Sequence, residues 1–263
     1  MPALPILFDA DILPAGLSRG EAIELVHFDV RAALVRPALR PRPHDAAALV
    51  ALWEEFLERD APLLGGQGIE PFVVLGVPPD AMPERGLALA FHRLAPLLGR
   101  RRVVAVGPAG LWGAGGAEEH ALRRHVELSR ETNRPLVVHL GRRAPAAGLE
   151  RLLCVLGEEE ADPARVLIVG PGAPSFRVLR EHGFPVALRP AAGRLSVGQV
   201  ADLVNLNGSE GILLASGAGG GHGDLLAVPK VLAAMKTLGM PRSALRRVAA
   251  RNAAAFFRID LGA

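Results

Sequence analysis

The chain has 263 residues, of which 50% are hydrophobic and 22% are charged, and its formal net charge is +3. This composition excludes an intrinsically disordered chain, and no apolar run reaches the roughly 20 residues that a membrane-spanning helix needs. Nearly all positive charges are arginines and no basic run is interleaved with aromatic residues, which argues against nucleic-acid recognition.

Short apolar runs alternate with amphipathic runs along the whole chain. The apolar runs predict strands at 4–8, 32–35, 71–75, 103–106, 136–139, 166–169, 185–188 and 211–214. Helical spacing of apolar residues predicts helices over 45–59, 118–131, 200–206 and 228–238. Strands that are apolar on successive residues are typical of parallel sheets covered on both faces. Eight such units favour an α/β fold, a closed (β/α)8 TIM barrel forming one domain over residues 1–263, rather than an open doubly wound sheet.

A proline-rich segment, residues 36–43, follows the second predicted strand. In a barrel this segment would lie on the C-terminal rim, where TIM barrels bind their ligands. A rigid connector is the simpler interpretation, and a ligand-binding segment is the alternative.

The start of the chain and its cysteine content bear on the compartment. No basic segment followed by an apolar run and a cleavage site begins the chain, so we expect no signal peptide. Cys154 is the single cysteine, which excludes an intrachain disulfide and a cysteine-based zinc site. We therefore expect a cytoplasmic protein without a membrane span.

Three segments resemble the TatD-like metal-dependent hydrolases of the amidohydrolase superfamily. They are a predicted strand that ends in His139 (133–139), the segment 223–230 and the tail 248–257. The resemblance covers most of the chain and is strongest from about Arg134 onward. It implies a (β/α)8 barrel that holds divalent metal ions at its C-terminal end, and His139 matches one metal-binding histidine of the family.

The first and fourth strands depart from the ligand set that the resemblance implies. Asp9 matches the leading residue of the family's Asp-x-His-x-His, but Asp11 and Leu13 stand at its two histidines. In the fourth strand, Pro108 stands where the family has a metal-bridging glutamate.

The sixth and eighth strands have also lost ligands. Val169 and Gly170 occupy the place of a family Asp-His pair, and Gly219 lies in a loop, 215–221, without any carboxylate. A hydrolytic metal site usually has three protein ligands and an open position for water. We therefore expect no dinuclear centre of the family type, no resident cofactor and no catalytic residue.

Two kinds of site remain possible at the barrel mouth. The first is an anion site, because several arginines fall just after predicted strand ends and guanidinium groups bind phosphate or carboxylate in a bidentate manner. These candidate ligand-binding residues are Arg36, Arg142, Arg143 and Arg189. The simpler interpretation is that they are solvated rim residues.

The second kind of site is a remodelled centre for one divalent metal ion such as zinc. Its candidate ligands are His139, Asp11, His222 and Asp224, which together offer nitrogen and oxygen donors.

The sequence thus predicts a TatD-like protein without catalysis, acting as a binding or scaffold protein. Its partner would be an unidentified protein or a small anionic ligand bound at the barrel mouth. The alternative is a metal-dependent hydrolase of phosphoester or amide bonds that uses the remodelled single-metal site.

Overall fold

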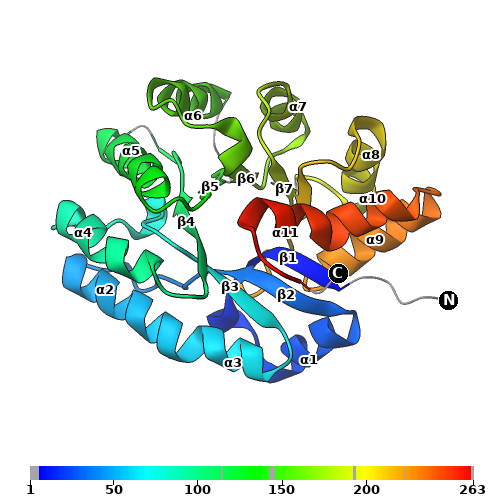
Figure 1. Ribbon diagram of the computed structural model, residues 1–263, viewed down its shortest axis with the longest axis horizontal. Helices are drawn as coiled ribbons and strands as arrows, with labels where there is room; N and C mark the ends of the chain where they lie inside the picture. Colours follow the sequence, from blue (N-terminus) through cyan, green and yellow to red (C-terminus); the bar gives the residue numbers. More distant parts are fainter. Residues whose placement is uncertain (1–5, 114, 142–145, 192–193, 222, 262–263) are drawn as a thin grey trace.

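The computed structural model describes residues 6–113, 115–141, 146–191, 194–221 and 223–261 (Figure 1). Eight parallel strands form one sheet whose spatial order follows the chain, from β1 to β8. The strands are β1 Leu7–Ile12, β2 Val30–Val35, β3 Glu70–Leu75, β4 Val103–Ala109, β5 Leu136–His139, β6 Val166–Val169, β7 Val186–Leu188 and β8 Ile212–Leu214. The predicted TIM barrel is confirmed.

Helices surround the sheet. They are α1 Arg19–His27, α2 Ala46–Glu55, α3 Ala61–Gly66, α4 Leu87–Leu98, α5 Gly116–Glu131, α6 Ala146–Glu158, α7 Ala173–Glu181, α8 Val197–Asn207, α9 Ala227–Thr237, α10 Arg242–Arg246 and α11 Asn252–Phe257. Short 3₁₀ turns are η1 Pro14–Gly16, η3 Pro79–Ala81 and η4 Pro163–Arg165, and π turns are η2 Phe56–Asp60 and η5 Arg247–Arg251. Within the described ranges, no helix combines the length and apolarity needed to cross a membrane.

The sheet closes between β8 and β1 at the end where the strands finish. The backbone N–H of Gly217 donates to the carbonyl of Asp11 and that of Leu13 donates to Ala218, each over 2.9 Å. The two backbone segments approach closely here, since a Cβ on Gly16 would lie 1.9 Å from the carbonyl oxygen of Gly219. Closure at this seam fixes the position of the first strand's carboxylates.

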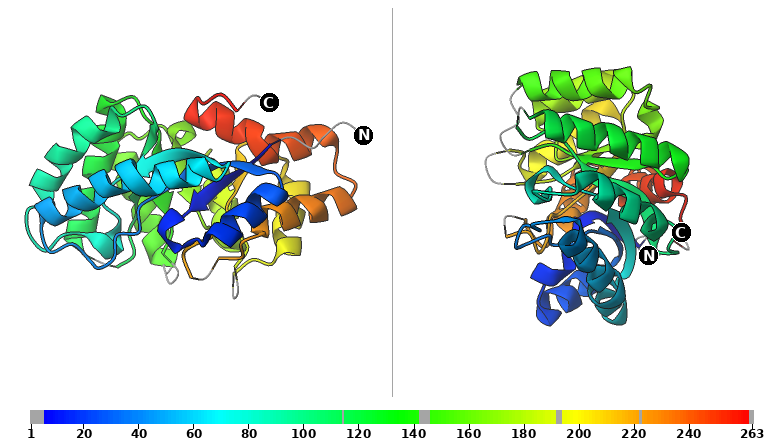
Figure 2. Two further views of the ribbon diagram at one scale, coloured as in Figure 1. Left: turned by 90° about the horizontal axis from the view of Figure 1, so that it is seen from below. Right: turned by 90° about the vertical axis from the view of Figure 1, so that its left-hand side faces the viewer.

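Apolar side chains from all eight strands fill the barrel interior in one cluster. At the end where the strands begin, Phe8 contacts the rings of Phe72 and Phe257, with centroids 6.1 and 5.9 Å apart. Phe257 belongs to α11, which lies across that end of the barrel (Figure 2). The other end, where the strands finish, is left for polar side chains.

The first strand differs from the prediction made from its apolar run. It begins at Leu7 and continues to Ile12, so it includes Asp9 and Asp11, whose exposed fractions are 0% and 2%. A prediction based on apolar residues alone ended the strand before these two aspartates. They can be buried within the strand because hydrogen bonds and arginines compensate their carboxyl groups.

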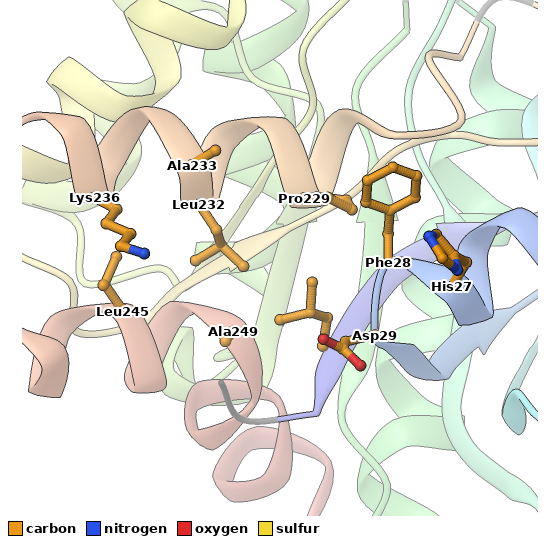
Figure 3. Close-up of a pocket in the computed structure, with 10 residues that line it drawn as sticks. His27, Phe28, Asp29, Pro229, Leu232, Ala233, Lys236, Leu245 and Ala249 are labelled. Atoms are coloured by element: carbon orange, nitrogen blue, oxygen red, sulfur yellow. The ribbon is translucent and has the colours of Figure 1, made fainter. Parts of the chain in front are cut away.

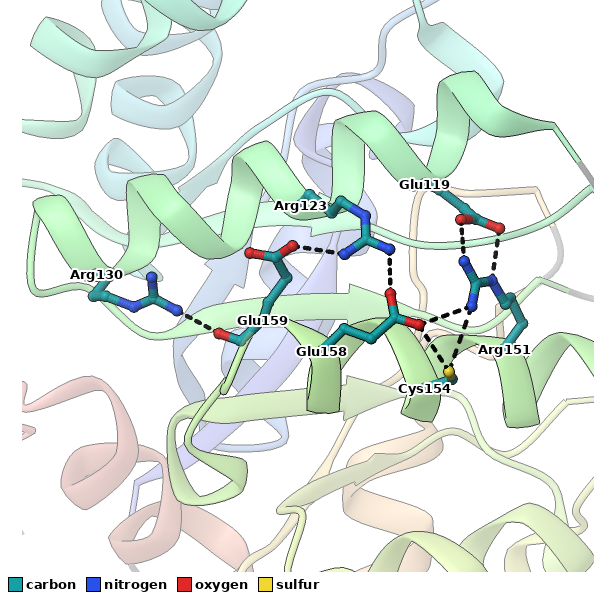
Figure 4. A network of polar contacts seen from close by, with 7 residues as sticks. All are labelled: Glu119, Arg123, Arg130, Arg151, Cys154, Glu158 and Glu159. Carbon is teal, nitrogen blue, oxygen red and sulfur yellow. Dashed lines mark hydrogen bonds and ion pairs between the residues drawn. The ribbon is translucent and has the colours of Figure 1, made fainter.

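Ion pairs link the outer faces of α5 and α6 (Figure 4). Arg151 Nη2 lies 2.6 Å from Glu119 Oε2, and Arg123 pairs with both Glu158 and Glu159. Cys154 on α6 is exposed and donates to Glu158 Oε1 over 3.0 Å. This network is solvated, so each pair contributes little to stability.

Candidate functional site at the barrel mouth

The polar side chains of the mouth follow from the alternation of the strands. In β2, β5 and β7, alternate residues contribute to the interior cluster. The last interior residues of these strands are Leu34, Val137 and Ala187. Two residues after each of them come Arg36, His139 and Arg189, respectively. Because successive side chains point to opposite faces of a strand, these three continue the inward-facing rows at the carboxyl end of the barrel.

Asp11 is a buried carboxylate held between two arginines. Arg36 Nε donates to Asp11 Oδ1 over 2.7 Å, and Arg189 Nη1 donates to Oδ2 over 3.1 Å. The Asp11 side chain is 1% exposed. Burial by itself would raise the pKa of Asp11, but the charges of Arg36 and Arg189 hold that pKa well below its ordinary value. Asp11 is therefore ionised, and each of its oxygens already has a guanidinium partner.

His139 ends β5 and is uncharged at neutral pH. Burial lowers its pKa to about 3, and the charges of Arg36 and Arg189 act in the same direction against the opposing effect of Asp11. The imidazole has no hydrogen-bond partner among the described residues. Its backbone carbonyl accepts a hydrogen bond from Trp112 Nε1 over 2.8 Å. Neither ring nitrogen is therefore bonded to another residue that the structure describes.

Asp9 lies at the seam between β1 and β8. Its Oδ1 accepts the backbone N–H groups of Asp11 and Ser216 over 3.1 and 3.0 Å. Its Oδ2 is buried and has no partner among the described residues. Burial raises the pKa of Asp9 to about 7. A large fraction of Asp9 is thus protonated near neutral pH, unlike Asp11.

A third guanidinium, that of Arg194, lies beside Arg189. It donates to the carbonyl of Gly170 over 2.7 Å and to that of Gly141 over 2.6 Å. A Cβ on Gly170 would lie 3.3 Å from Arg194 Nη1 and 3.7 Å from Arg189 Nη2, so both guanidinium groups pack on this glycine. Sequence reasoning missed Arg194, because no local pattern distinguishes it from a surface arginine and its partners are 24 and 53 residues away.

The mouth carries an excess of positive charge. Three guanidinium groups face one ionised carboxylate, a neutral imidazole and a carboxyl group that is largely protonated below pH 7. Each guanidinium has five N–H donors. Within the described ranges, Arg36 and Arg189 use one each, both on Asp11. Their remaining donors can bind an oxyanion.

The structure therefore brings together part of the predicted anion site. Arg36 and Arg189 follow the second and seventh strands, and they meet at Asp11. Arg142 and Arg143 lie outside the described residues. The proline-rich segment buries Leu39 in the core, and Arg42 Nε donates to the carbonyl of Met82 over 2.8 Å. These contacts agree with a connector.

The residues named for a metal ion do not fit one in the described part of the chain. Both oxygens of Asp11 are engaged by arginines, and Asp224 lies 2.6 Å from Lys230 Nζ with its side chain 38% exposed. His222 lies outside the described residues. No group of three or more His, Cys, Asp or Glu among the described residues has a metal-binding arrangement.

Known proteins share this architecture. A TatD-like protein of Archaeoglobus fulgidus superposes with a TM-score of 0.80 at 18% identity, covering 96% of this chain and 100% of that one. This chain has the TatD-like barrel fold. A TatD homologue of Escherichia coli gives a TM-score of 0.66 at 17% identity, covering 97% and 98% of the two chains. The resemblance seen in the sequence is confirmed at the level of the fold.

Two further comparisons concern activity. The chain is 23% identical over 208 residues to an uncharacterized metal-dependent hydrolase of Methanocaldococcus jannaschii, which is 79% of this chain and 82% of that protein. A phosphotriesterase homology protein of Escherichia coli, solved with phosphate in its active site, gives a TM-score of 0.69 at 14% identity, covering 97% and 99% of the two chains. No protein-family model matches this chain.

Proposed function

We propose that this TatD-like barrel is a binding protein without hydrolase activity, and that its mouth holds a small anion through Arg36 and Arg189. The observation that carries the proposal is the position of Asp11 between these two guanidinium groups. Asp11 stands where the resemblance implies a metal-binding histidine. Here its negative charge balances arginines instead of a metal ion.

Electrostatics disfavours a divalent ion beside Asp11. At an effective dielectric constant of about 20, two unit charges about 4 Å apart interact by about 4 kcal/mol. A divalent ion would therefore meet a repulsion on the order of several kcal/mol from each neighbouring guanidinium. Asp11 would also have to give up two charge-assisted hydrogen bonds to serve as a ligand.

The same arrangement favours an oxyanion. The unused donors of Arg36 and Arg189 belong to side chains that are 20% exposed, so they can be reached from solvent while their charge is only partly screened. Neutral His139 adds a ring nitrogen that can donate one hydrogen bond. The phosphate held by the structurally similar E. coli protein makes inorganic phosphate the first probe to use.

A metal-dependent hydrolase of phosphoester or amide bonds is the second candidate function. Its support is the imidazole of His139, which bonds to none of the described residues, and the name of the M. jannaschii relative. A metal ion would lower the pKa of a bound water to make a nucleophile. For this function, Arg36 and Arg189 would have to release Asp11.

Calorimetric titration with phosphate and small carboxylates tests the proposed anion site. We expect binding, and we expect Arg189→Gln to weaken it at least about tenfold, because a hydrogen bond to a charged group contributes roughly 1.5–3 kcal/mol. Arg31→Gln is the matched control, since Arg31 lies on β2, the strand that Arg36 follows, and its side chain is 43% exposed. Absence of heat with every anion would refute the anion site.

Metal analysis and an activity panel test the loss of catalysis. Protein purified without chelator should contain under about a tenth of an equivalent of zinc, manganese or nickel, and chelator should leave its melting temperature unchanged. Metal-dependent turnover of a phosphoester or amide that is abolished by His139→Ala would establish the hydrolase instead. A protein that co-purifies at fixed stoichiometry would indicate a scaffold.

A further inference from the structure

A groove lies far from the mouth, near the residues at which β1 and β2 begin (Figure 3). It is a cavity of about 270 Å³ between α1, α9 and the η5 turn. Its floor is formed by three buried apolar residues, Leu7, Leu245 and Ala249. One face of α9 forms a wall, because residues three, four and seven apart lie on the same side of a helix. That face consists of Pro229, Leu232, Ala233 and Lys236.

Lys236 directs an unpaired positive charge into this groove. Among the described residues, its ammonium has no ion pair or hydrogen bond, whereas Lys230 on the same helix contacts Asp224 at 2.6 Å. Figure 3 shows the Lys236 side chain extending from α9 toward Leu245 of α10. The groove therefore has an apolar body with a cation at one end.

The opposite end of the groove is aromatic and acidic. Phe28 has 43% of its surface exposed, and its ring meets that of His27 edge to face with centroids 5.4 Å apart. Asp29 lies beside them at the end remote from Lys236 (Figure 3). Small-molecule sites are mostly apolar with a few placed polar groups, and this volume lies just below their usual range, so the ligand must be small.

We propose that this groove binds a small apolar monocarboxylate, such as a medium-chain acid. Its hydrocarbon body lies on Leu232, Leu245 and Ala249, and its carboxylate pairs with Lys236 Nζ. A second carboxylate would have to leave water beside Asp29, whose own charge Arg31 balances only in part over 3.9 Å, so a dicarboxylic acid of the same length binds more weakly. The groove is separate from the mouth, and the proposal does not rest on the anion site described there.

Titration of the full chain with butanoate, hexanoate, octanoate and octan-1-ol tests the proposal. Inorganic phosphate is added to the buffer as a competitor for the arginines of the mouth. We expect affinity to rise about fourfold for each added methylene group, since burying one contributes about 0.8 kcal/mol. The rise should level off once the chain outgrows the groove, which runs about 10 Å along α9. Octanedioate should bind more weakly than octanoate.

Two variants assign the binding to this groove. Lys236→Met should weaken octanoate about fivefold and leave octan-1-ol unchanged, because an exposed ion pair contributes up to about 1 kcal/mol. Lys230→Met, on the same helix outside the groove, is the control and should leave both ligands unchanged. Ala233→Leu, at an exposed position, should fill the groove and abolish binding of both ligands while the melting temperature is retained.

Three results would overturn the proposal. One is the absence of octanoate binding by the folded wild type. The second is octanoate binding that is the same in wild type and Lys236→Met. The third is binding that persists in folded Ala233→Leu, which would place the acid elsewhere.

Discussion

Asp9 on β1 accepts the backbone N–H of Ser216, which follows β8, over 3.0 Å across the seam of the barrel. The same carboxyl oxygen accepts the N–H of Asp11, and the other oxygen is buried with no partner in the described part of the chain. A single side chain thus links the first strand to the loop after the last strand. Because burial raises its pKa to about 7, this link is sensitive to pH.

Asp9→Asn should change how stability depends on pH. In the wild type, folded Asp9 binds its proton up to about pH 7, whereas an unfolded Asp releases it near pH 4. The folded state therefore holds more protons between these values, and the contribution of Asp9 to stability falls as pH rises from 4 to 7. The amide does not titrate, so the stability of Asp9→Asn relative to wild type should increase over this range by about 1.4 kcal/mol per pKa unit.

Urea unfolding of both proteins between pH 4 and 8 measures this difference, and subtraction cancels the histidines common to both. Asp202→Asn, at an exposed position on α8, is the control and should parallel the wild type. A difference between Asp9→Asn and wild type that stays constant with pH would show that folding does not raise the pKa of Asp9.

Arg189→Met should destabilise the fold. It removes one of the two guanidinium groups that compensate a carboxylate whose exposed fraction is 1%. Breaking a fully buried pair from one side costs about 3–5 kcal/mol, and the 20% exposure of Arg189 reduces this to about 1–3 kcal/mol. The double variant Asp11→Asn/Arg189→Met should recover part of the loss, because the buried carboxylate is gone and the charge left without a partner, that of Arg36, belongs to a side chain that is 20% exposed.

The control for this experiment is Arg31→Met, whose guanidinium is 43% exposed and 3.9 Å from Asp29. Its free energy of unfolding should differ from wild type by less than about 0.5 kcal/mol. If Arg189→Met were as stable as Arg31→Met, Asp11 would not depend on Arg189.

The sequence predicts the barrel well and the site only in part. Apolar runs separated by amphipathic segments are a local pattern, and seven of the strands begin and end close to the predicted residues. The rule that carboxyl ends of parallel strands share one rim also places Arg36, His139 and Arg189 at one end. These inferences need no knowledge of side-chain packing.

The ion pairs within the site join residues that are far apart in the chain, and no local sequence pattern predicts such contacts. Arg36 and Arg189 lie 25 and 178 residues from Asp11, and nothing in their spacing predicts that both would bind that one carboxylate. The bounds of β1 were wrong for a related reason, since Asp9 is buried through a hydrogen bond to Ser216, 207 residues away. Roles for the predicted residues Arg142, Arg143 and His222 remain predictions.

His125 should remain neutral well below pH 6. It is buried on α5, where its Nδ1 contacts the carbonyl of Ala121 at 2.6 Å and its Nε2 accepts the N–H of Val77 over 3.0 Å. Burial lowers its pKa to about 4. Nitrogen NMR at pH 5 should show the neutral form with its proton on Nδ1. Protons on both ring nitrogens at that pH would contradict the assignment.

The same histidine should contribute to acid sensitivity. Its folded pKa lies below the unfolded value near 6.5, so the unfolded state gains protons first as pH falls. The contribution of His125 to stability is complete above about pH 6.5 and is lost progressively toward pH 4. His139 acts in the same direction, since its pKa is about 3.

Cys154 should react slowly with alkylating reagents despite its exposure. Its thiol donates to Glu158 Oε1, and this hydrogen bond is the largest of the influences that raise its pKa. Because the thiolate is the nucleophile, raising the pKa lowers the reactive fraction. Alkylation at pH 8 should be faster in Glu158→Gln than in the wild type. Glu150→Gln, at an exposed position of the same helix, is the control and should leave the rate unchanged. Equal rates in all three proteins would show that the hydrogen bond is absent in solution.

Gly217→Ala should displace the side chain of Arg189. Gly221→Ala is the control, because it introduces the same kind of backbone strain without touching Arg189. Both glycines have positive φ, +68° and +75°, so alanine costs roughly 1–2 kcal/mol at either position. A Cβ at 217 would lie 2.9 Å from Arg189 Cδ and 3.0 Å from its Nη1, whereas a Cβ at 221 would have no atom of the described residues within 4 Å. We therefore expect Gly217→Ala to be the less stable variant.

The extra loss should be about 1–3 kcal/mol, because displacing Arg189 breaks its charge-assisted hydrogen bond to Asp11. Gly217→Ala should also weaken phosphate binding at the mouth, whereas Gly221→Ala should retain it. Measuring the free energy of unfolding and phosphate affinity on the same samples separates the two effects. Equal losses of unfolding free energy in both variants would mean that the Arg189 guanidinium moves aside without cost. Its position beside Gly217 would then not be needed for its hydrogen bond to Asp11.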